Sequence, residues 1–312
     1  MAFAPHDPRR AILLKVTSVM AFTAMAALIK YSSTHVPAGQ SVFFRSFFAL
    51  IPIAILLWHR RMLNTAFATE NVRGHLLRGL SGALGMACGF GALALLPLPE
   101  AIALGYAMPI FATALAALVL GEVVRLYRWS AIFVGLGGVL VILWPRLTLI
   151  ERGFATSGET LGALLSLAAS MLGALSIIQT RKLVETEQTA TIVVYFSLIC
   201  SAFGLLTVPL GWSTPELYIA ALLVLAGICG GIGQLLLTES YRFADTSTIA
   251  PFEYTSMLFG LAIGFLIFGE TPTVTTMVGA SIVIGAGLFI IYREHQLGLE
   301  RARARKAVTP QG

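Results

Sequence analysis

Ten continuously apolar stretches, separated by short polar segments, fill almost the whole of this 312-residue chain. Each is close to the roughly 20 residues that an α-helix needs to cross a hydrocarbon core about 30 Å thick. Strands of a membrane barrel alternate polar and apolar positions, and these stretches do not alternate. The pattern predicts an all-α integral membrane protein with ten transmembrane helices. We expect these helices at residues 11–31, 38–58, 76–95, 99–119, 128–144, 161–179, 190–209, 216–237, 247–267 and 275–292.

The second half of the chain repeats features of the first. Tyr106 followed by Gly121-Glu122 recurs, at the same spacing, as Tyr254 followed by Gly269-Glu270. Because five helices form one unit, the second unit must enter the membrane from the opposite side. Inverted repeats of this kind build the central site of many secondary transporters. The expected units are an N-terminal tail (1–10), a first repeat (11–144), a periplasmic linker (145–160), a second repeat (161–292) and a basic tail (293–312).

Composition and charge agree with a membrane protein and orient it. Only 12% of the residues are charged, whereas a soluble domain carries about 25%. Most of the 21 lysines and arginines lie in the two tails and in the loops after the second, fourth, sixth and eighth helices. The positive-inside rule therefore predicts that both termini are cytoplasmic. The basic cluster from Arg301 to Lys306 fits anchoring to the lipid surface, and no nucleic-acid partner is expected.

Four charged residues fall at or near membrane depth, where an ionisable side chain usually faces a cavity or a partner: Arg45, Glu253, Lys30 and Glu100. Arg45, flanked by phenylalanines, could bind an electron-rich group of a substrate, or could form a structural bond to helix ends or to an acid. Glu253 suits proton coupling or recognition of a cation, or could be a fixed counter-ion to Arg45 or Lys30. Lys30 either extends to the membrane surface or faces the cavity.

Prolines and uncharged polar residues extend the candidate site. Pro109 and Pro251 are expected to loosen related helices in the two repeats, as in transporters whose helices break at the site. Four side chains could reach a central cavity or could only join helices: Tyr195, Tyr254, Gln179 and Gln234. Tyr106 shares these alternatives, and the repeat relates it to Tyr254.

Several further motifs are structural in our interpretation. Glu100 opens the fourth helix and is expected to cap it. Glu122 and Glu270 end the fourth and ninth helices, where the dipole disfavours them, and are expected to cap the N-terminus of the next helix. Gly85-x-x-x-Gly89, Gly227-x-x-x-Gly231 and Gly260-x-x-x-Gly264 allow close packing of helices, either within one subunit or between the subunits of a homodimer.

Signatures of enzymes are missing from the sequence. The five histidines are scattered without metal-ligand spacing. No Gly-x-Ser-x-Gly elbow and no phosphate-binding Gly-x-x-x-x-Gly-Lys-Ser/Thr loop occurs. We therefore expect no enzymatic activity, no cofactor and no metal.

The sequence resembles the EamA branch of the drug/metabolite transporter superfamily. The similarity covers residues 10–292 and is carried by Phe44-Arg45-Ser46, Ala107-Met108-Pro109-Ile110-Phe111, Leu120-Gly121-Glu122, Ile249-Ala250-Pro251-Phe252-Glu253-Tyr254 and Phe268-Gly269-Glu270. The resemblance implies a carrier of the bacterial inner membrane that works by alternating access without ATP. It also implies a central cavity between the two halves, with the fifth and tenth helices at the periphery.

Within that superfamily, the segments around Arg45 and Glu253 look similar to bacterial uptake carriers for riboflavin or S-adenosylmethionine. The expected function is therefore uptake of a small organic metabolite of this kind. Aromatic walls near Arg45 could stack a planar ring, and Glu253 could bind a cationic centre. The alternatives are efflux of amino acids or related metabolites and, more remotely, a membrane scaffold or a channel.

Overall fold

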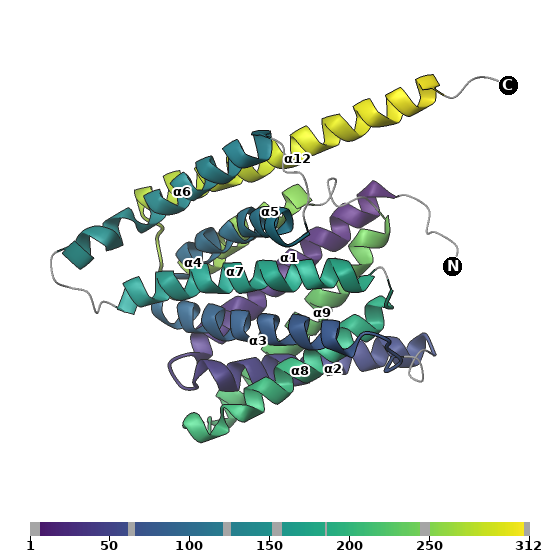
Figure 1. Ribbon diagram of the computed structural model, residues 1–312. Coiled ribbons are helices and arrows are strands. Elements are labelled where there is room, and N and C mark those ends of the chain that lie inside the picture. The colour runs from purple at the N-terminus through teal and green to yellow at the C-terminus, as the bar shows by residue number, and fades with distance from the viewer. Residues whose placement is uncertain are drawn as a thin grey trace.

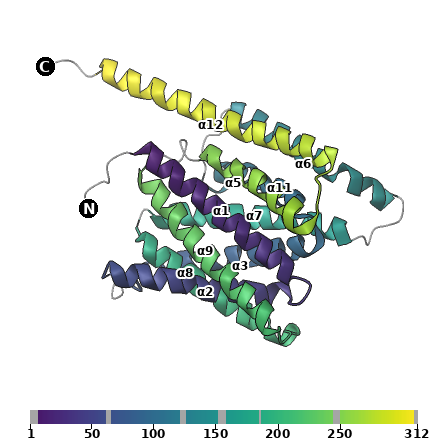
Figure 2. The same cartoon turned by 180° about the vertical axis from the view of Figure 1, so that it is seen from behind.

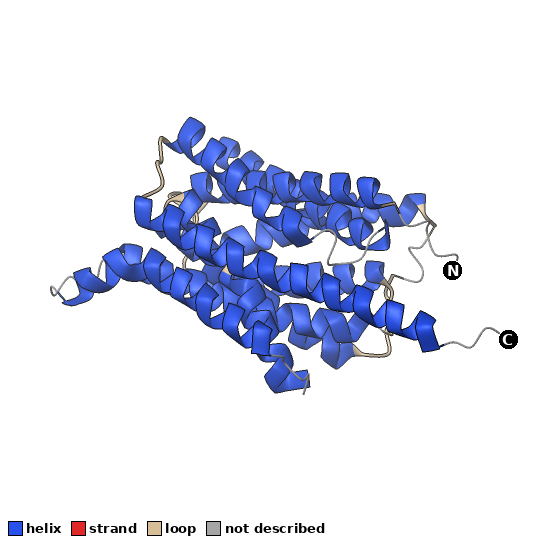
Figure 3. Ribbon diagram, turned by 90° about the horizontal axis from the view of Figure 1, so that it is seen from above, coloured by secondary structure: helices blue, strands red, loops and turns tan. Residues whose placement is uncertain are grey.

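The computed structural model describes residues 7–61, 66–120, 126–151, 158–184, 186–243 and 250–308. Within these ranges the chain forms helices and connecting turns, and no strand (Figure 3). The first half contains α1 (Pro8–Ser32), α2 (Ala38–His59), α3 (Val72–Leu95), α4 (Leu98–Gly105), α5 (Ala107–Leu120) and α6 (Leu126–Glu151). The second half contains α7 (Gly158–Val184), α8 (Thr189–Leu206), η1 (Val208–Leu210), α9 (Leu217–Phe243), η2 (Ala250–Tyr254), α11 (Thr255–Phe268) and α12 (Val274–Val308).

All ten expected spans are present, eight as single helices and two as broken ones. Five helices are long and apolar enough to cross a membrane on length and composition alone: α1, α2, α3, α7 and α9. Shorter apolar helices form the other five spans. The fold class is therefore confirmed as an all-α membrane bundle.

The two halves run in opposite directions (Figures 1 and 2). Helix α1 starts at the end of the bundle that carries both chain termini, which we call the terminal end; α7 starts at the opposite end, the far end. Packing follows the same symmetry: α1 packs on α9 as α7 packs on α3, while α2 packs on α8 and α6 packs on α12. These contacts are those of two inverted five-helix repeats around a pseudo-twofold axis.

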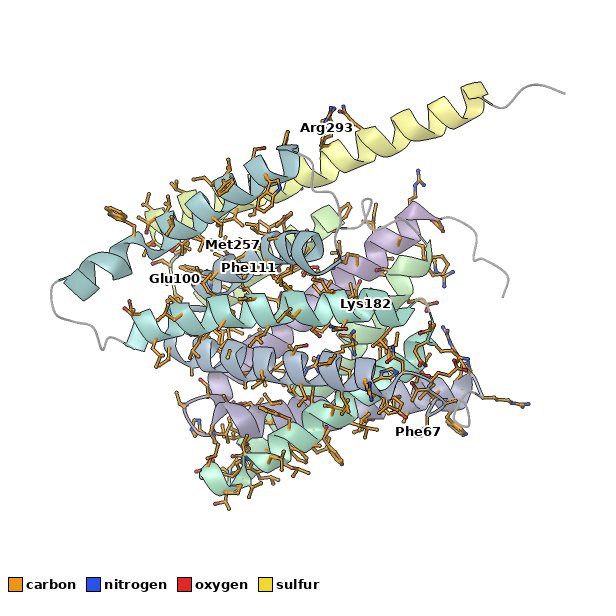
Figure 4. All side chains as sticks on the ribbon, viewed as in Figure 1. Phe67, Glu100, Phe111, Lys182, Met257 and Arg293 are labelled. Atoms are coloured by element: carbon orange, nitrogen blue, oxygen red, sulfur yellow. The ribbon has the colours of Figure 1, made fainter. Side chains whose placement is uncertain are left out.

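Helices α6 and α12 form a peripheral pair on one side of the bundle (Figure 1). A buried apolar cluster joins this pair to α4, α5, α7 and α11. Figure 4 shows Phe111 and Met257, two residues of that region, between the pair and α7. The peripheral position agrees with the arrangement that the family resemblance implies.

The fourth and ninth spans are broken at related positions. Helix α4 ends at Gly105 and α5 begins at Ala107, with Tyr106 between them (φ −67°, ψ −7°). In the second half η2 ends at Tyr254 (φ −69°, ψ −11°), and α11 follows directly. The two tyrosines thus share one backbone conformation at one position of the repeat.

The prolines expected to loosen these helices lie beside the breaks rather than at them. Pro109 falls in the first turn of α5, where a missing backbone N–H disrupts little. Pro251 falls in the short 3₁₀-helix η2. The side chains of both prolines lie outside the described residues, as does Glu122.

Two helices begin earlier than expected because polar caps precede them. Asp7 caps α1 by accepting a hydrogen bond from the N–H of Arg10, and Pro8 follows at the first helical position. Asn71 caps α3 by accepting from the N–H of Gly74. Lys15 and Arg78 consequently lie about two turns inside their helices instead of near the ends.

Other boundaries differ in a similar way. Helix α6 continues through residues 145–151 of the expected linker, and α12 continues through most of the expected basic tail to Val308. Residues 158–160 of the expected linker open α7. Residues 152–157 and 309–312 lie outside the described residues, as does most of the N-terminal tail.

The three glycine motifs are used inside the subunit. A Cβ on Gly85 would contact Leu172 on α7. One on Gly231 would contact Pro52 and the backbone of Ala49 on α2, and one on Gly264 would contact Pro99 on α4. Close packing of helices within one chain therefore accounts for these glycines, and a homodimer stays a prediction without an assigned interface.

Candidate functional site

The two broken spans meet in the interior of the bundle through their repeat-related tyrosines. The rings of Tyr106 and Tyr254 are 5.1 Å apart in an edge-to-face arrangement. The Tyr106 hydroxyl donates to the carbonyl of Tyr254 (3.3 Å) and shares a hydrogen bond with Ser256 Oγ (2.7 Å). The structure thus brings together the pair that the repeat singled out.

Hydroxyl groups satisfy the carbonyls that the breaks would leave exposed. Thr255 donates to the carbonyl of Phe252 (2.6 Å), and Ser256 donates to that of Glu253 (2.7 Å). In the other half, Ser170 on α7 donates to the carbonyl of Leu104 (3.3 Å). Irregular backbone at membrane depth is tolerated only when such partners or a water-lined cavity are available, so both breaks are built into the fold.

A partly buried ion pair adjoins this junction. Lys15 Nζ on α1 contacts Glu253 Oε2; the lysine side chain is 4% exposed and the glutamate side chain 45%. Glu253 therefore pairs with neither Arg45 nor Lys30, the counter-ions considered from the sequence. Gly105, directly before the break in the first half, has open space where a Cβ would point. The carboxylate of Glu253 stays partly accessible although it is paired with Lys15.

Arg45 lies in a separate cluster formed by α2, α3 and α8. Its guanidinium carbon is 5.9 Å from the centre of the Phe196 ring, and that of Arg78 is 4.3 Å from the same ring. Arg78 donates to Thr180 Oγ1 (2.7 Å) and to the carbonyl of Ile192 (3.0 Å). Both arginines are 5% exposed, and no ion pair joins either one to a carboxylate in the described part of the chain.

Lys30 closes the far end of the bundle. Its ammonium group lies 3.0 Å from Glu270 Oε1 and donates to the carbonyls of Leu93 and Leu96 at the end of α3. The other Glu270 oxygen accepts from the N–H of Leu98, the first residue of α4 (2.7 Å). Glu270 therefore caps α4 of the first repeat, whereas the sequence suggested that it caps the following helix, α12. Lys30 is held inside the protein instead of extending to the membrane surface.

Glu100 belongs to the same far end, as Figure 4 shows. It lies in the first turn of α4 and is 4% exposed. Its Oε1 accepts a hydrogen bond from Thr276 Oγ1 on α12 (3.4 Å). The turns at this end are thus tied to one another by charged and polar side chains.

Tyr195 lies at the terminal end, apart from the other two tyrosines. Its hydroxyl donates to the carbonyl of Phe67 (3.1 Å), and its ring stacks on buried His75 at 4.5 Å. His75 Nε2 is 3.8 Å from Glu187 Oε1. Figure 4 shows Phe67 and Lys182 at this end. These contacts fit a structural role for Tyr195 in holding the inter-helix turns.

Glu187 organises the same turns. Burial disfavours its charged form, but hydrogen bonds from Thr69 Oγ1 (2.6 Å) and from the N–H groups of Glu70 (3.0 Å) and Asn71 (3.2 Å) outweigh burial. The pKa of Glu187 is therefore below the ordinary value for glutamate.

Gln179 and Gln234 are half-buried, and neither side chain forms a hydrogen bond with another described residue. Sequence reasoning did not include Lys15 and Arg78 among the candidate site residues, since it counted them with the basic residues in and beside the tails and loops. Asp7-Pro8 and Asn71 signal helix starts that place both residues deeper. No cluster of three or more potential metal ligands occurs in the described ranges.

Comparison with known proteins agrees with this architecture. The EamA-like transporter family matches the chain twice, over residues 9–144 and 160–293. A solved structure described as "Crystal structure of protein" has the same fold, with a TM-score of 0.63 at 19% identity over 91% of this chain and 97% of its own.

Curated relatives are similar over most of their length. The pseudopaline exporter of Pseudomonas aeruginosa is 29% identical over 88% of this chain and 93% of its own. The S-adenosylmethionine uptake transporter of Rickettsia prowazekii is 30% identical over 85% and 86%, and the riboflavin transporter of Rhizobium johnstonii is 29% identical over 92% and 94%. This chain belongs to the EamA-like transporter family and is a multi-pass membrane transporter, not an enzyme.

Proposed function

We propose that this protein carries a small organic metabolite across the bacterial inner membrane by alternating access, with the terminal end in the cytoplasm. The observation that supports this most directly is the junction of the two broken spans. Breaks at equivalent positions of inverted repeats allow one half to rock against the other around a fixed site. Tyr106 and Tyr254 form this junction, and the Lys15–Glu253 pair adjoins it.

The proposed cargo is an adenosyl or flavin compound, taken up into the cell. Relatives named for uptake of S-adenosylmethionine and for transport of riboflavin are similar over most of the chain. Glu253 is the residue proposed to respond to a cationic centre or a proton, because its side chain remains 45% exposed although it pairs with Lys15. Arg45 is proposed to contact the cargo as well.

Efflux is the second candidate. A relative named as an exporter is as similar to this chain as the uptake carriers are. The same inverted architecture can work in either direction, because direction is set by the gradients of cargo and coupling ion. Amino acids or related metabolites are the cargo proposed for that case.

Counterflow in proteoliposomes tests the carrier proposal. Vesicles loaded with unlabelled S-adenosylmethionine or riboflavin should accumulate the labelled compound transiently above equilibrium, and Glu253→Gln should abolish or alter this accumulation. A pore would let the label equilibrate without overshoot, and a scaffold would give no flux. Either result would contradict the proposal.

Whole cells distinguish uptake from efflux. Cells that make the protein should gain label from the medium faster than control cells if the protein is an uptake carrier. Faster loss of preloaded label, without faster gain, would support the efflux alternative instead.

A further inference from the structure

The cluster around Phe196 has an unbalanced charge. Arg45 enters it from α2 and Arg78 from α3, and both guanidinium groups approach the one aromatic ring of α8. At a rise of 1.5 Å per residue, each arginine lies about 10 Å inside the nearer end of its helix. Both are therefore within a hydrocarbon core about 30 Å thick.

Protein groups compensate these two charges only in part. Arg78 has a hydroxyl and a carbonyl as acceptors, whereas Arg45 Nε is buried without a hydrogen-bond partner. The recorded ion pairs of the described residues involve other cations: Lys15, Lys30, Arg60 and His75. A buried charge without a counter-charge is destabilising by several kcal/mol, and the ring of Phe196 offsets only about 1–2 of these.

The surrounding residues leave room for the arginine and the ring. A Cβ on Gly230 of α9 would lie 3.2 Å from Arg45 Nε. A Cβ on Gly82 of α3 would collide with the Phe196 ring. Larger residues at these two glycines would push the guanidinium group or the ring out of place, so the cluster is a built feature of the helix interfaces.

Guanidinium groups bind carboxylates and phosphates through paired, charge-assisted hydrogen bonds. We propose that Arg45 and Arg78 form an anion subsite that binds a carboxylate or phosphate group of the cargo. The ring of Phe196 contacts both cations, with its centre 5.9 Å from the guanidinium carbon of Arg45 and 4.3 Å from that of Arg78, and stabilises them until the anion arrives. Because both arginines are 5% exposed, the anion reaches them when the helices move apart during transport.

This inference rests on the proposed carrier function and narrows its cargo to organic anions and zwitterions. S-adenosylmethionine carries a carboxylate, whereas riboflavin carries neither a carboxylate nor a phosphate. The subsite therefore favours cargo of the first kind, or a phosphorylated flavin over the free vitamin. The proposed subsite also gives Arg78 a role in binding the cargo, whereas the comparison with relatives assigns it none.

Two pairs of compounds that differ only in the anionic group test the subsite with the full-length purified protein. S-adenosylmethionine is compared with its decarboxylated form, and flavin mononucleotide with riboflavin, by thermal stabilisation and by calorimetry. In at least one pair, the anionic member should bind at least tenfold more tightly. Equal binding within both pairs, or no binding of any of the four compounds or of inorganic phosphate, would overturn the subsite.

Variants assign the preference to residues. Arg45→Gln and Arg78→Gln should each reduce the preference for the anionic member at least tenfold, and Arg45→Lys should restore part of it. Arg60→Gln is the matched control, because Arg60 is partly exposed and pairs with Glu239 at the terminal end. A preference that survives in both glutamine variants would contradict the proposal, and the wild-type comparison remains decisive if a variant does not fold.

Counterflow keeps this inference separable from the carrier proposal. Saturable overshoot with riboflavin and no preference for anionic compounds would leave the carrier standing and remove the subsite. Anion-selective stabilisation that depends on both arginines, without counterflow of any compound, would leave the subsite and remove the carrier.

Discussion

The buried cations of α1 are paired with carboxylates, whereas those of α2 and α3 have no such partner among the described residues. On α1, each lysine has its own glutamate: Lys15 pairs with Glu253 and Lys30 with Glu270. On α2 and α3, Arg45 and Arg78 share an aromatic ring and have no glutamate within the described residues. Paired charges fix one arrangement of helices, whereas unpaired charges remain available for a ligand.

The largest expected effect on the free energy of unfolding comes from removing the Lys30–Glu270 ion pair at the far end. Lys30→Met leaves Glu270 without its counter-ion and frees the carbonyls of Leu93 and Leu96. We expect the free energy of unfolding to fall by about 3 kcal/mol, measured by denaturation in detergent micelles. Arg45→Met is the comparison, and it should leave the free energy of unfolding unchanged or raise it, because it removes an unpaired buried charge. A loss for Arg45→Met as large as that for Lys30→Met would contradict the distinction.

The second pair on α1 should contribute less. Lys15→Met leaves Glu253 unpaired, but that carboxylate is 45% exposed and solvent screens it. We expect a loss of about 1 kcal/mol in the free energy of unfolding. A double-mutant cycle with Glu253→Gln measures the coupling between the two residues. A coupling energy as large as that between Lys30 and Glu270, or larger, would show that solvent exposure does not determine which ion pair contributes more to stability.

Adding a methyl group next to Arg45 should weaken anion binding more than it lowers the stability of the fold. Gly230→Ala places a methyl group 3.2 Å from Arg45 Nε and 2.8 Å from Met25 Sδ. We expect anion binding to weaken about fivefold, which corresponds to roughly 1 kcal/mol of overpacking. Gly91→Ala is the matched control, because its methyl group would contact only Leu165 at 3.2 Å. Equal effects of the two variants on calorimetric affinity would argue against a role for the space around Arg45.

The smallest effect concerns Glu187, a structural carboxylate in a turn between helices. Its lowered pKa means that the folded protein holds the charged form more firmly than the unfolded chain does. This contribution is complete above the unfolded pKa and is lost as the pH falls through the lower folded pKa. Glu187→Gln should therefore lower the melting temperature by a few degrees at pH 7 and have progressively less effect below about pH 4. A difference that persists unchanged down to pH 3 would contradict this assignment.

The sequence predicted the fold well because its signals are local. Each span follows from an apolar run of membrane length, and the inversion follows from an odd number of helices per repeat. The repeat singled out Tyr106 and Tyr254, and the structure shows that their two rings are in contact.

The charge partners could not be predicted in the same way. Pairing depends on which helices pack together: Lys15 meets Glu253 only because α1 packs on η2, and Lys30 meets Glu270 at the turn before α12. Helix boundaries added a second error. Without the caps at Asp7 and Asn71, Lys15 and Arg78 would lie at the membrane surface, where a cation needs no explanation.

Lys30 also has a consequence for solvent. Its ammonium group occupies the carbonyls that end α3, and no other described donor satisfies those of Leu93 and Leu96 when it leaves. If the far end opens during transport, water must take the place of the lysine at these carbonyls. Opening would then take up solvent as well as cargo, and excluded osmolytes such as sucrose should slow that half of the cycle by lowering the water activity.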